Sequence, residues 1–209
     1  MANGRLTLLE RTLADFVAQL GSAAPTPGGG SVAALTGAQA AALVVMVCEL
    51  TLGKPRFAEH EAQLTTVRDQ AADLQTELLN LVEADIAAYD QLAAAYRLPR
   101  ETEGRAAQIA AALGPATEAP LAIAESAAAV LALVPEVVAH GNQHAVSDAG
   151  MAALLAAAAV RSAALNVLIN LSGNPDEAAV KAYRDRLGRA GTGLAQADAI
   201  YAAVCGKLA

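Results

Sequence analysis

Asp85 is the residue of this sequence whose surroundings point most directly to chemistry. Steps of three and four residues from Leu64 to Ala95 select a seam of alanine, leucine and valine side chains that Asp85 interrupts. An ionised carboxylate in such a seam costs free energy unless a cation or water compensates it. Asp85 is therefore either paired in a salt bridge that sets helix register, exposed in a cavity, or raised in pKa for acid and base catalysis.

Three consecutive glycines precede another apolar stretch, in "TPGGGSVAALTG". Gly28, Gly29 and Gly30 with Ser31 at the predicted N-cap suit a loop whose backbone comes close to a ligand and leaves free N–H groups at a helix start. The alternative is a tight connection between helices. Because the segment lacks the lysine of a phosphate-binding P-loop, it disfavours a nucleotide.

Polar residues near the other apolar stretches have two interpretations each. Ser147 and Asp148 can be a helix cap and a first-turn acid with no further role. Arg161, Asn166 and Asn170 lie in "AAAAVRSAALNVLINL" and need partners if they are buried. Pairing with an acid inside a helix bundle is the simple structural alternative for them.

The sequence predicts no metal site. His140 and His144 are four residues apart, but Gly141 and Asn142 interrupt a helix between them and no HExxH motif occurs. The serine and cysteine residues also lack the histidine and acid arrangement of a catalytic triad.

The elements that must position these residues are helical. Apolar residues recur at intervals of three and four along nearly the whole chain, and Gly or Pro clusters separate the stretches. "LGPATEAP" predicts a kink or a split within one of them. Without a repeat or a long linker, residues 1–209 are predicted to form a single domain. The pattern predicts an all-α bundle of about six helices with one long helix, at Leu6–Leu20, Ser31–Leu52, Phe57–Tyr96, Thr102–Ala139, Ser147–Leu171 and from Pro175 to the C-terminus.

The composition disfavours nucleic acid and membrane partners. Fourteen Lys and Arg face 21 Asp and Glu, for a net charge of −7, and no basic cluster is dense enough to follow a phosphate backbone. Residues 32–52 and 148–171 approach the length of a membrane span, but they contain polar or charged residues and much alanine. We expect buried helices of a soluble bundle.

Two further expectations concern the compartment and the assembly. The two cysteines form no CxxC motif and no signal peptide begins the sequence, which predicts a cytoplasmic protein. With 3% aromatic residues and no tryptophan, the core must be built from small and aliphatic side chains. The long helix would extend about 60 Å, beyond one ordinary domain, so its apolar seam predicts self-association, most simply as a twofold homodimer.

Several segments together resemble the cyclodeaminase/cyclohydrolase family. That family comprises the C-terminal part of formiminotransferase-cyclodeaminase and stand-alone bacterial methenyltetrahydrofolate cyclohydrolases. The resemblance extends over nearly the whole chain. Its segments, in order, are "PTPGGGSVAALTGAQAAALVVMV", "LTLGKPRF", "VEADIAAYDQLAAAYRLP", "GNQHAVSDAGMAA" and "LNVLINL".

The resemblance implies an all-helical homodimer that binds a reduced folate in a cleft beside the glycine loop. It implies that Asp85 is the general base and that Asp148 positions substrate or water. Lys54 is expected to hold a carboxylate of the glutamyl tail. The substrate-binding residues that it implies are Gly28, Gly29, Gly30, Ser31, Lys54, Arg161 and Asn166, with Asn170 beside them.

The implied reaction is hydrolysis of 5,10-methenyltetrahydrofolate to 10-formyltetrahydrofolate. The alternative within the family is the formimidoyltetrahydrofolate cyclodeaminase reaction, which releases ammonia. The sequence contains no formiminotransferase domain, which favours the cyclohydrolase. A third alternative is a folate-binding or structural helical dimer without turnover. Neither reaction requires a metal, or a cofactor beyond the tetrahydrofolate substrate.

Overall fold

The computed structural model describes residues 7–208, and every regular element within them is helical. Four short 3-10 helices, at Leu8–Glu10, Pro55–His60, Gln143–Ala145 and Gly191–Gly193, join or precede the α-helices. The α-helices are α1 (Leu13–Leu20), α2 (Gly29–Glu49), α3 (Glu61–Arg97), α4 (Arg105–His140), α5 (Val146–Leu171), α6 (Glu177–Ala190) and α7 (Leu194–Leu208).

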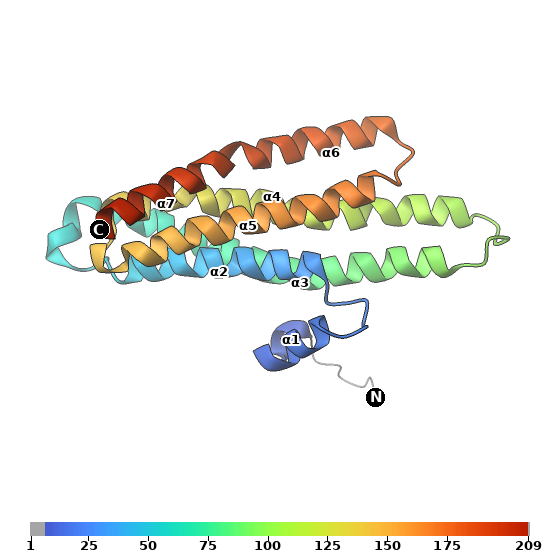
Figure 1. Cartoon of the computed structure of the whole chain (residues 1–209), viewed down its shortest axis with the longest axis horizontal. Helices are drawn as coiled ribbons and strands as arrows, with labels where there is room; N and C mark the ends of the chain where they lie inside the picture. Colours follow the sequence, from blue (N-terminus) through green and yellow to red (C-terminus); the bar gives the residue numbers. More distant parts are fainter. Residues whose placement is uncertain (1–6, 209) are drawn as a thin grey trace.

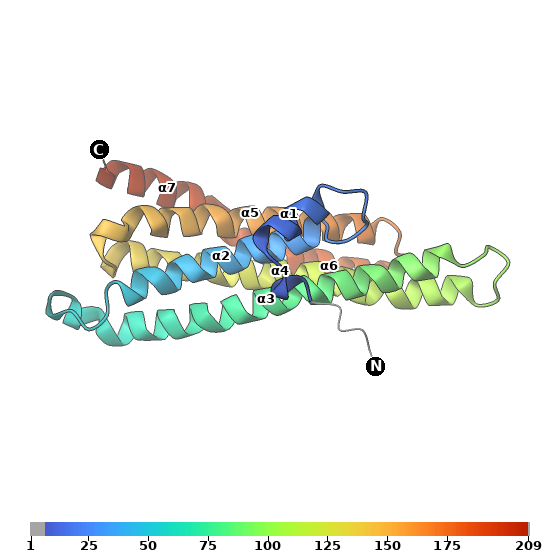
Figure 2. The ribbon, with the colours of Figure 1, turned by 90° about the horizontal axis from the view of Figure 1, so that it is seen from below.

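Helices α2, α3, α4 and α5 form an up-and-down bundle, because each connection reverses the direction of the chain (Figure 1). Helices α6 and α7 extend along the side formed by α4 and α5 (Figure 1). Helix α1 lies on the opposite side, where Phe16 packs into the main core (Figures 1 and 2). The bundle therefore brings the start of α2 beside the end of α5.

The core of the bundle is built from small residues, which allows the helices to approach closely. Ala34, Ala41, Ala153 and Ala156 are completely buried. A Cβ atom on Gly37 of α2 would lie 3.0 Å from a methyl group of Leu78 on α3, so α2 and α3 meet where a side chain is missing.

The all-α prediction is confirmed, and two of its details are corrected. The last predicted helix is two helices, α6 and α7, which a 3-10 turn at Gly191–Gly193 separates. Helix α4 is continuous, so of the predicted kink or split the split is wrong, although the helix contains three prolines. Each proline removes one backbone hydrogen bond, but packing against α3 and α5 maintains the helix. Leu6, the expected start of the first helix, lies outside the described residues.

Three helices have the length and hydropathy of a membrane span, namely α2, α4 and the stretch from Gln143 to Leu171. The first and third overlap the two apolar segments recognised in the sequence. In each helix, between 44% and 56% of the most apolar window is buried inside the protein. The bundle core thus accounts for about half of each apolar window.

Candidate active site at the glycine loop

The glycine segment forms the start of α2. Gly28 is the N-cap in an extended conformation, and the helix begins at Gly29. Ser31, the predicted N-cap, is instead the third residue of the helix and is completely buried. Without side chains at positions 29 and 30, the first turn fits against α3 and α5, so the helix begins earlier than the serine suggested.

Asp85 of α3 lies directly against this first turn. The hydroxyl group of Ser31 donates a hydrogen bond to Oδ2 of Asp85 at 3.4 Å, and the backbone N–H of Ser31 donates as well. A Cβ atom on Gly30 would lie 2.5 Å from Oδ2 and closer still to the other carboxyl atoms. The carboxylate therefore occupies the space that any side chain at position 30 would need.

The surroundings of Asp85 disfavour its charged form relative to water. Burial raises the pKa of Asp85 above its ordinary value of 3.8, and the two hydrogen bonds from Ser31 oppose part of that rise. Asp85 forms no salt bridge with any residue in the described range 7–208. Of the three interpretations of Asp85, the salt bridge for register is thus wrong, and a carboxylate in a cavity with a raised pKa describes the structure.

Asp85 opens into a cavity of about 360 Å³ between the glycine loop, α3, α4 and α5. This volume suits a small organic molecule. Besides Gly28, Gly29 and Gly30, the lining combines apolar and aromatic side chains with polar ones, and includes Thr26, Tyr89, Leu92, Pro120, Ile169, Asp85, Asn166 and Asn170.

The cavity includes further residues that the sequence did not single out as site residues, among them Tyr89 and Pro120. Tyr89 is one helical turn after Asp85 and therefore shares its face of α3. That spacing was the available signal for Tyr89. Pro120 was noticed only as a possible break in α4, and its place in the cavity depends on packing that the sequence does not reveal.

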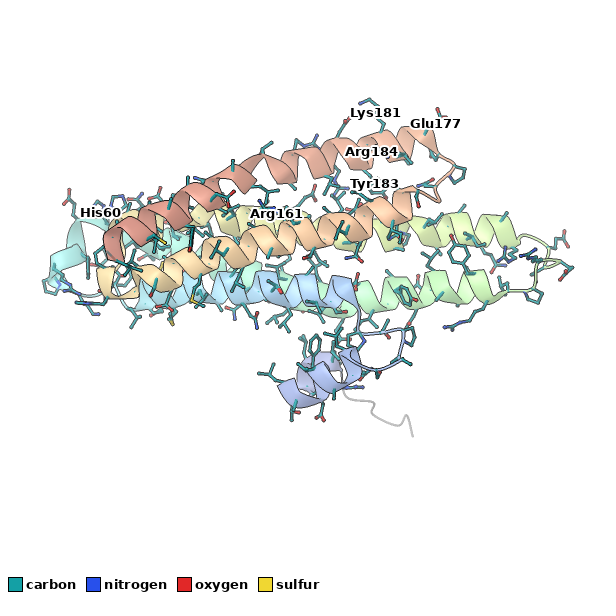
Figure 3. All side chains as sticks on the ribbon, in the orientation of Figure 1. His60, Arg161, Glu177, Lys181, Tyr183 and Arg184 are labelled. Atoms are coloured by element: carbon teal, nitrogen blue, oxygen red, sulfur yellow. The ribbon has the colours of Figure 1, made fainter. Side chains whose placement is uncertain are left out.

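The structure separates three of the predicted site residues from the cavity. Lys54 follows the far end of α2, and the 21 residues of that helix extend about 30 Å. Asp148 lies in the first turn of α5, about 27 Å along the helix from Asn166. Arg161 is exposed near the middle of α5 and does not line the cavity (Figure 3).

The donor set of the cavity suits hydrogen bonding to an organic ligand. One carboxylate, two amides and the hydroxyl groups of Thr26 and Tyr89 line it, and within residues 7–208 no basic side chain does. Elsewhere in residues 7–208, no three His, Cys, Asp or Glu side chains are close enough to hold a metal ion. A cationic or donor-rich ligand matches this lining best.

Comparison with known proteins supports the resemblance seen in the sequence. A methenyltetrahydrofolate cyclohydrolase of Methylorubrum extorquens is 44% identical over 171 residues, which cover 80% of this chain and 82% of that protein. The formimidoyltransferase-cyclodeaminase of Sus scrofa is 35% identical over 87% of this chain, which spans only 34% of that longer protein.

A solved structure, that of formiminotetrahydrofolate cyclodeaminase from Thermotoga maritima, has the same fold. It superposes with a TM-score of 0.84 at 27% identity, over 97% of this chain and 98% of that one. The family model described as formiminotransferase-cyclodeaminase matches residues 12–189. This chain therefore belongs to the formiminotransferase-cyclodeaminase family.

Proposed function

We propose that this protein is an enzyme of folate metabolism, a methenyltetrahydrofolate cyclohydrolase that converts 5,10-methenyltetrahydrofolate to 10-formyltetrahydrofolate. The observation that carries the proposal is the partly buried Asp85 carboxylate, without a cationic partner among residues 7–208, at the wall of a cavity of about 360 Å³. The 44% identity to a protein with this activity in its name supports the same reaction.

The reaction follows from the position of one carboxylate beside a cationic substrate. The ionised Asp85 stabilises the positive charge on the methenyl carbon, which bridges N5 and N10 of the substrate. Water attacks that carbon, and Asp85 accepts a proton from the water, so a neutral hydroxyl adduct forms. The adduct then loses its hydroxyl proton to solvent while the bond from carbon to N5 breaks. N5 takes the proton from Asp85, and the formyl group remains on N10.

The raised pKa of Asp85 suits both halves of this sequence. A carboxylate with an ordinary pKa would be a weak base toward water, whereas burial strengthens it as a base. The same group then returns the proton to N5. The reaction needs no metal, and no cofactor beyond the tetrahydrofolate substrate, because the carbon that water attacks is already cationic.

The cyclodeaminase reaction is the second candidate, since the pig and Thermotoga relatives carry that activity in their names. In that reaction N10 attacks a formimino carbon on N5 and ammonia leaves, and the same carboxylate accepts and returns the protons. A helical dimer that binds folate without turnover is the third candidate. Asp85→Asn separates it from the first two, because a purely binding or structural role does not need an ionisable group.

We further propose that the protein works as a homodimer through an exposed apolar surface on α2 and α5. On α5 the exposed residues recur at coiled-coil spacing, which is typical of a helix that packs against another. This surface, called here the α2–α5 surface, consists of Met46, Leu50, Met151, Leu154, Leu165 and Leu168, each at least 36% exposed.

A twofold arrangement of the α2–α5 surface gives Lys54 and Asp148 a place near the substrate. A twofold axis perpendicular to the long axis of the bundle turns the second copy end for end, which brings its Lys54 end beside the glycine loop of the first. The cavity has no basic side chain of its own, whereas the far end of the bundle carries Lys54 and Arg56. The partner's Lys54 would bind a carboxylate of the glutamyl tail, and the partner's Asp148 would position substrate or water. Arg161 would lie within the interface.

The remaining expectations from the sequence are proposals of the same kind. The proposed activity suits a protein of the cytoplasm, and we propose that residues 1–209 form one domain. Size-exclusion chromatography with light scattering measures the assembly directly. A monomer at micromolar concentration would contradict the dimer.

The decisive experiment follows the near-ultraviolet absorbance of 5,10-methenyltetrahydrofolate with purified protein. The absorbance should fall faster than by spontaneous hydrolysis, and Asp85→Asn should remove the acceleration. If the protein accelerates nothing here but releases ammonia from 5-formiminotetrahydrofolate, the cyclodeaminase is the correct assignment. An Asp85→Asn variant with full activity in either assay would refute the role of Asp85.

A further inference from the structure

Pro120 removes one hydrogen bond from α4 at the wall of the cavity. Proline has no backbone N–H, so the carbonyl four residues earlier, at Ala116, has no donor within the helix. The Nδ2 group of Asn170 on α5 donates to that carbonyl at 2.6 Å. A side chain of one helix thus replaces a backbone bond that the proline removes from another.

This bond determines which way the amide of Asn170 faces. A carbonyl group only accepts, so the nitrogen of the amide must lie against Ala116, and Oδ1 remains unused. Asn166, one turn earlier, has the same arrangement, because its Nδ2 group donates to the carbonyl of Ser162 at 3.1 Å. Within residues 7–208, no donor forms a hydrogen bond to the Oδ1 atom of Asn166 or of Asn170. Neither oxygen is fully buried, so both remain accessible as acceptors. The cavity therefore presents two oriented acceptors.

We propose that Asn166 and Asn170 are specificity residues that accept hydrogen bonds from N–H donors on the ring system of the ligand. Together with Asp85 they give the cavity three acceptors. In two of the three, one N–H of the amide nitrogen is bound to a backbone carbonyl group, which fixes the side of the amide that carries the free oxygen. The free amide oxygens favour a ligand edge that carries N–H donors.

This inference rests on the proposed function for the identity of the ligand. In a reduced folate, the donors are the ring N–H and the exocyclic amino group of the pyrimidine ring. The carboxylates of the glutamyl tail must remain outside the cavity, where no acceptor faces them. A ligand without the donors leaves the two amide oxygens unpaired, and sites built around hydrogen bonds reject such analogues strongly.

The test compares two ligands by calorimetry, so it does not require turnover. The first is 5-formyltetrahydrofolate, and the second is the same compound with a methyl group in place of the 2-amino group. The wild-type protein should bind the second about 10- to 100-fold more weakly, because an amide oxygen loses its donor.

The informative variant is Asn170→Leu in a Pro120→Ala background. Alanine at position 120 restores a backbone N–H to the carbonyl of Ala116, so the leucine leaves no unpaired carbonyl and the protein stays folded. The smaller side chain at position 120 affects both ligands alike, so the ratio of their affinities isolates the acceptor. That ratio should fall to within about threefold in the double variant, whereas Pro120→Ala alone should lower it less.

Pro135→Ala is the matched control, since it also removes a proline from α4 but lies outside the cavity. It should retain the wild-type ratio. A double variant that discriminates as well as the wild type would overturn the inference, as would a wild type that binds both compounds equally. If the wild type binds neither compound, both the proposed function and this inference fail. That result differs from equal binding of the two compounds, which overturns this inference alone.

Discussion

Replacing Gly30 with alanine should remove most of the catalytic activity while the bundle remains folded. The substitution adds a single carbon atom, and it adds it where the carboxylate of Asp85 lies. The added Cβ would be 2.5 Å from Oδ2 of Asp85 and nearer still to the other carboxyl atoms. Gly30 is therefore expected to matter because of the space it leaves for the general base.

The size of the effect follows from this geometry. Atoms that are not bonded need roughly 3.5 Å, so the carboxylate must move by about 1 Å. A displacement of that size at a reacting group costs about 100-fold in rate. Overpacking costs about 1–3 kcal/mol of stability, and the better helix propensity of alanine returns up to about 1 kcal/mol. The net loss of about 0–3 kcal/mol leaves a typical domain folded.

Gly29→Ala is the matched control for this experiment. A Cβ atom at position 29 would lie 3.6 Å from the amide of Asn166, which is ordinary contact. The measurement is kcat/KM for 5,10-methenyltetrahydrofolate, followed by loss of absorbance, with circular dichroism to verify folding. Equal activities of the two alanine variants would refute the argument that Gly30 makes room for the base.

Three other predictions follow from the structure. Asp85→Asn should raise the free energy of unfolding at neutral pH. Burial raises the pKa of Asp85, so the stability of the wild type falls as pH rises from about 3.8 through that raised pKa, and asparagine avoids this loss. Urea denaturation at several pH values measures the difference, and a variant less stable than the wild type at neutral pH would contradict the prediction. Mixing inactive Asp85→Asn and Asp148→Asn protomers should restore about 25% of wild-type activity, because half of the dimers are mixed and each has one intact site; no recovery would mean that Asp148 does not act across the dimer. Arg186→Met should lower the free energy of unfolding, measured by urea denaturation, by about 1 kcal/mol, because Arg186 on α6 binds Glu118 and Glu125 of α4 in a partly exposed network. The kcat/KM of this variant should match that of the wild type, and a change would show that α6 influences the cavity.

The sequence predicted the site best where a helical period is regular. Asp85 was recognised because it interrupts an apolar seam, and Asn170 because an amide within an apolar helix needs a partner. Both interpretations depend only on spacing along one helix, which the structure preserves. The glycines were recognised because three in a row are unusual before a helix, and the structure places them in the same cavity.

The details that the sequence did not predict depend on contacts between distant segments. The partner of Asn170 is a carbonyl 54 positions away, and it is free only because of a proline four residues after it. The first turn of α2 begins at Gly29 because neighbouring helices leave room for it. Lys54 and Asp148 belong to matching motifs, but spacing along one chain does not show whether they meet the cavity of a second copy.

The position of Tyr89 gives this protein an internal optical reporter. The chain has four tyrosines and no tryptophan, so tyrosine dominates its intrinsic fluorescence. Of the four, Tyr89 alone lines the cavity, and the other three are all within the described residues. Reduced folates absorb in the region where tyrosine emits. Occupation of the site will therefore dim the tyrosine emission, most strongly that of Tyr89, and the protein can report its own saturation without a label.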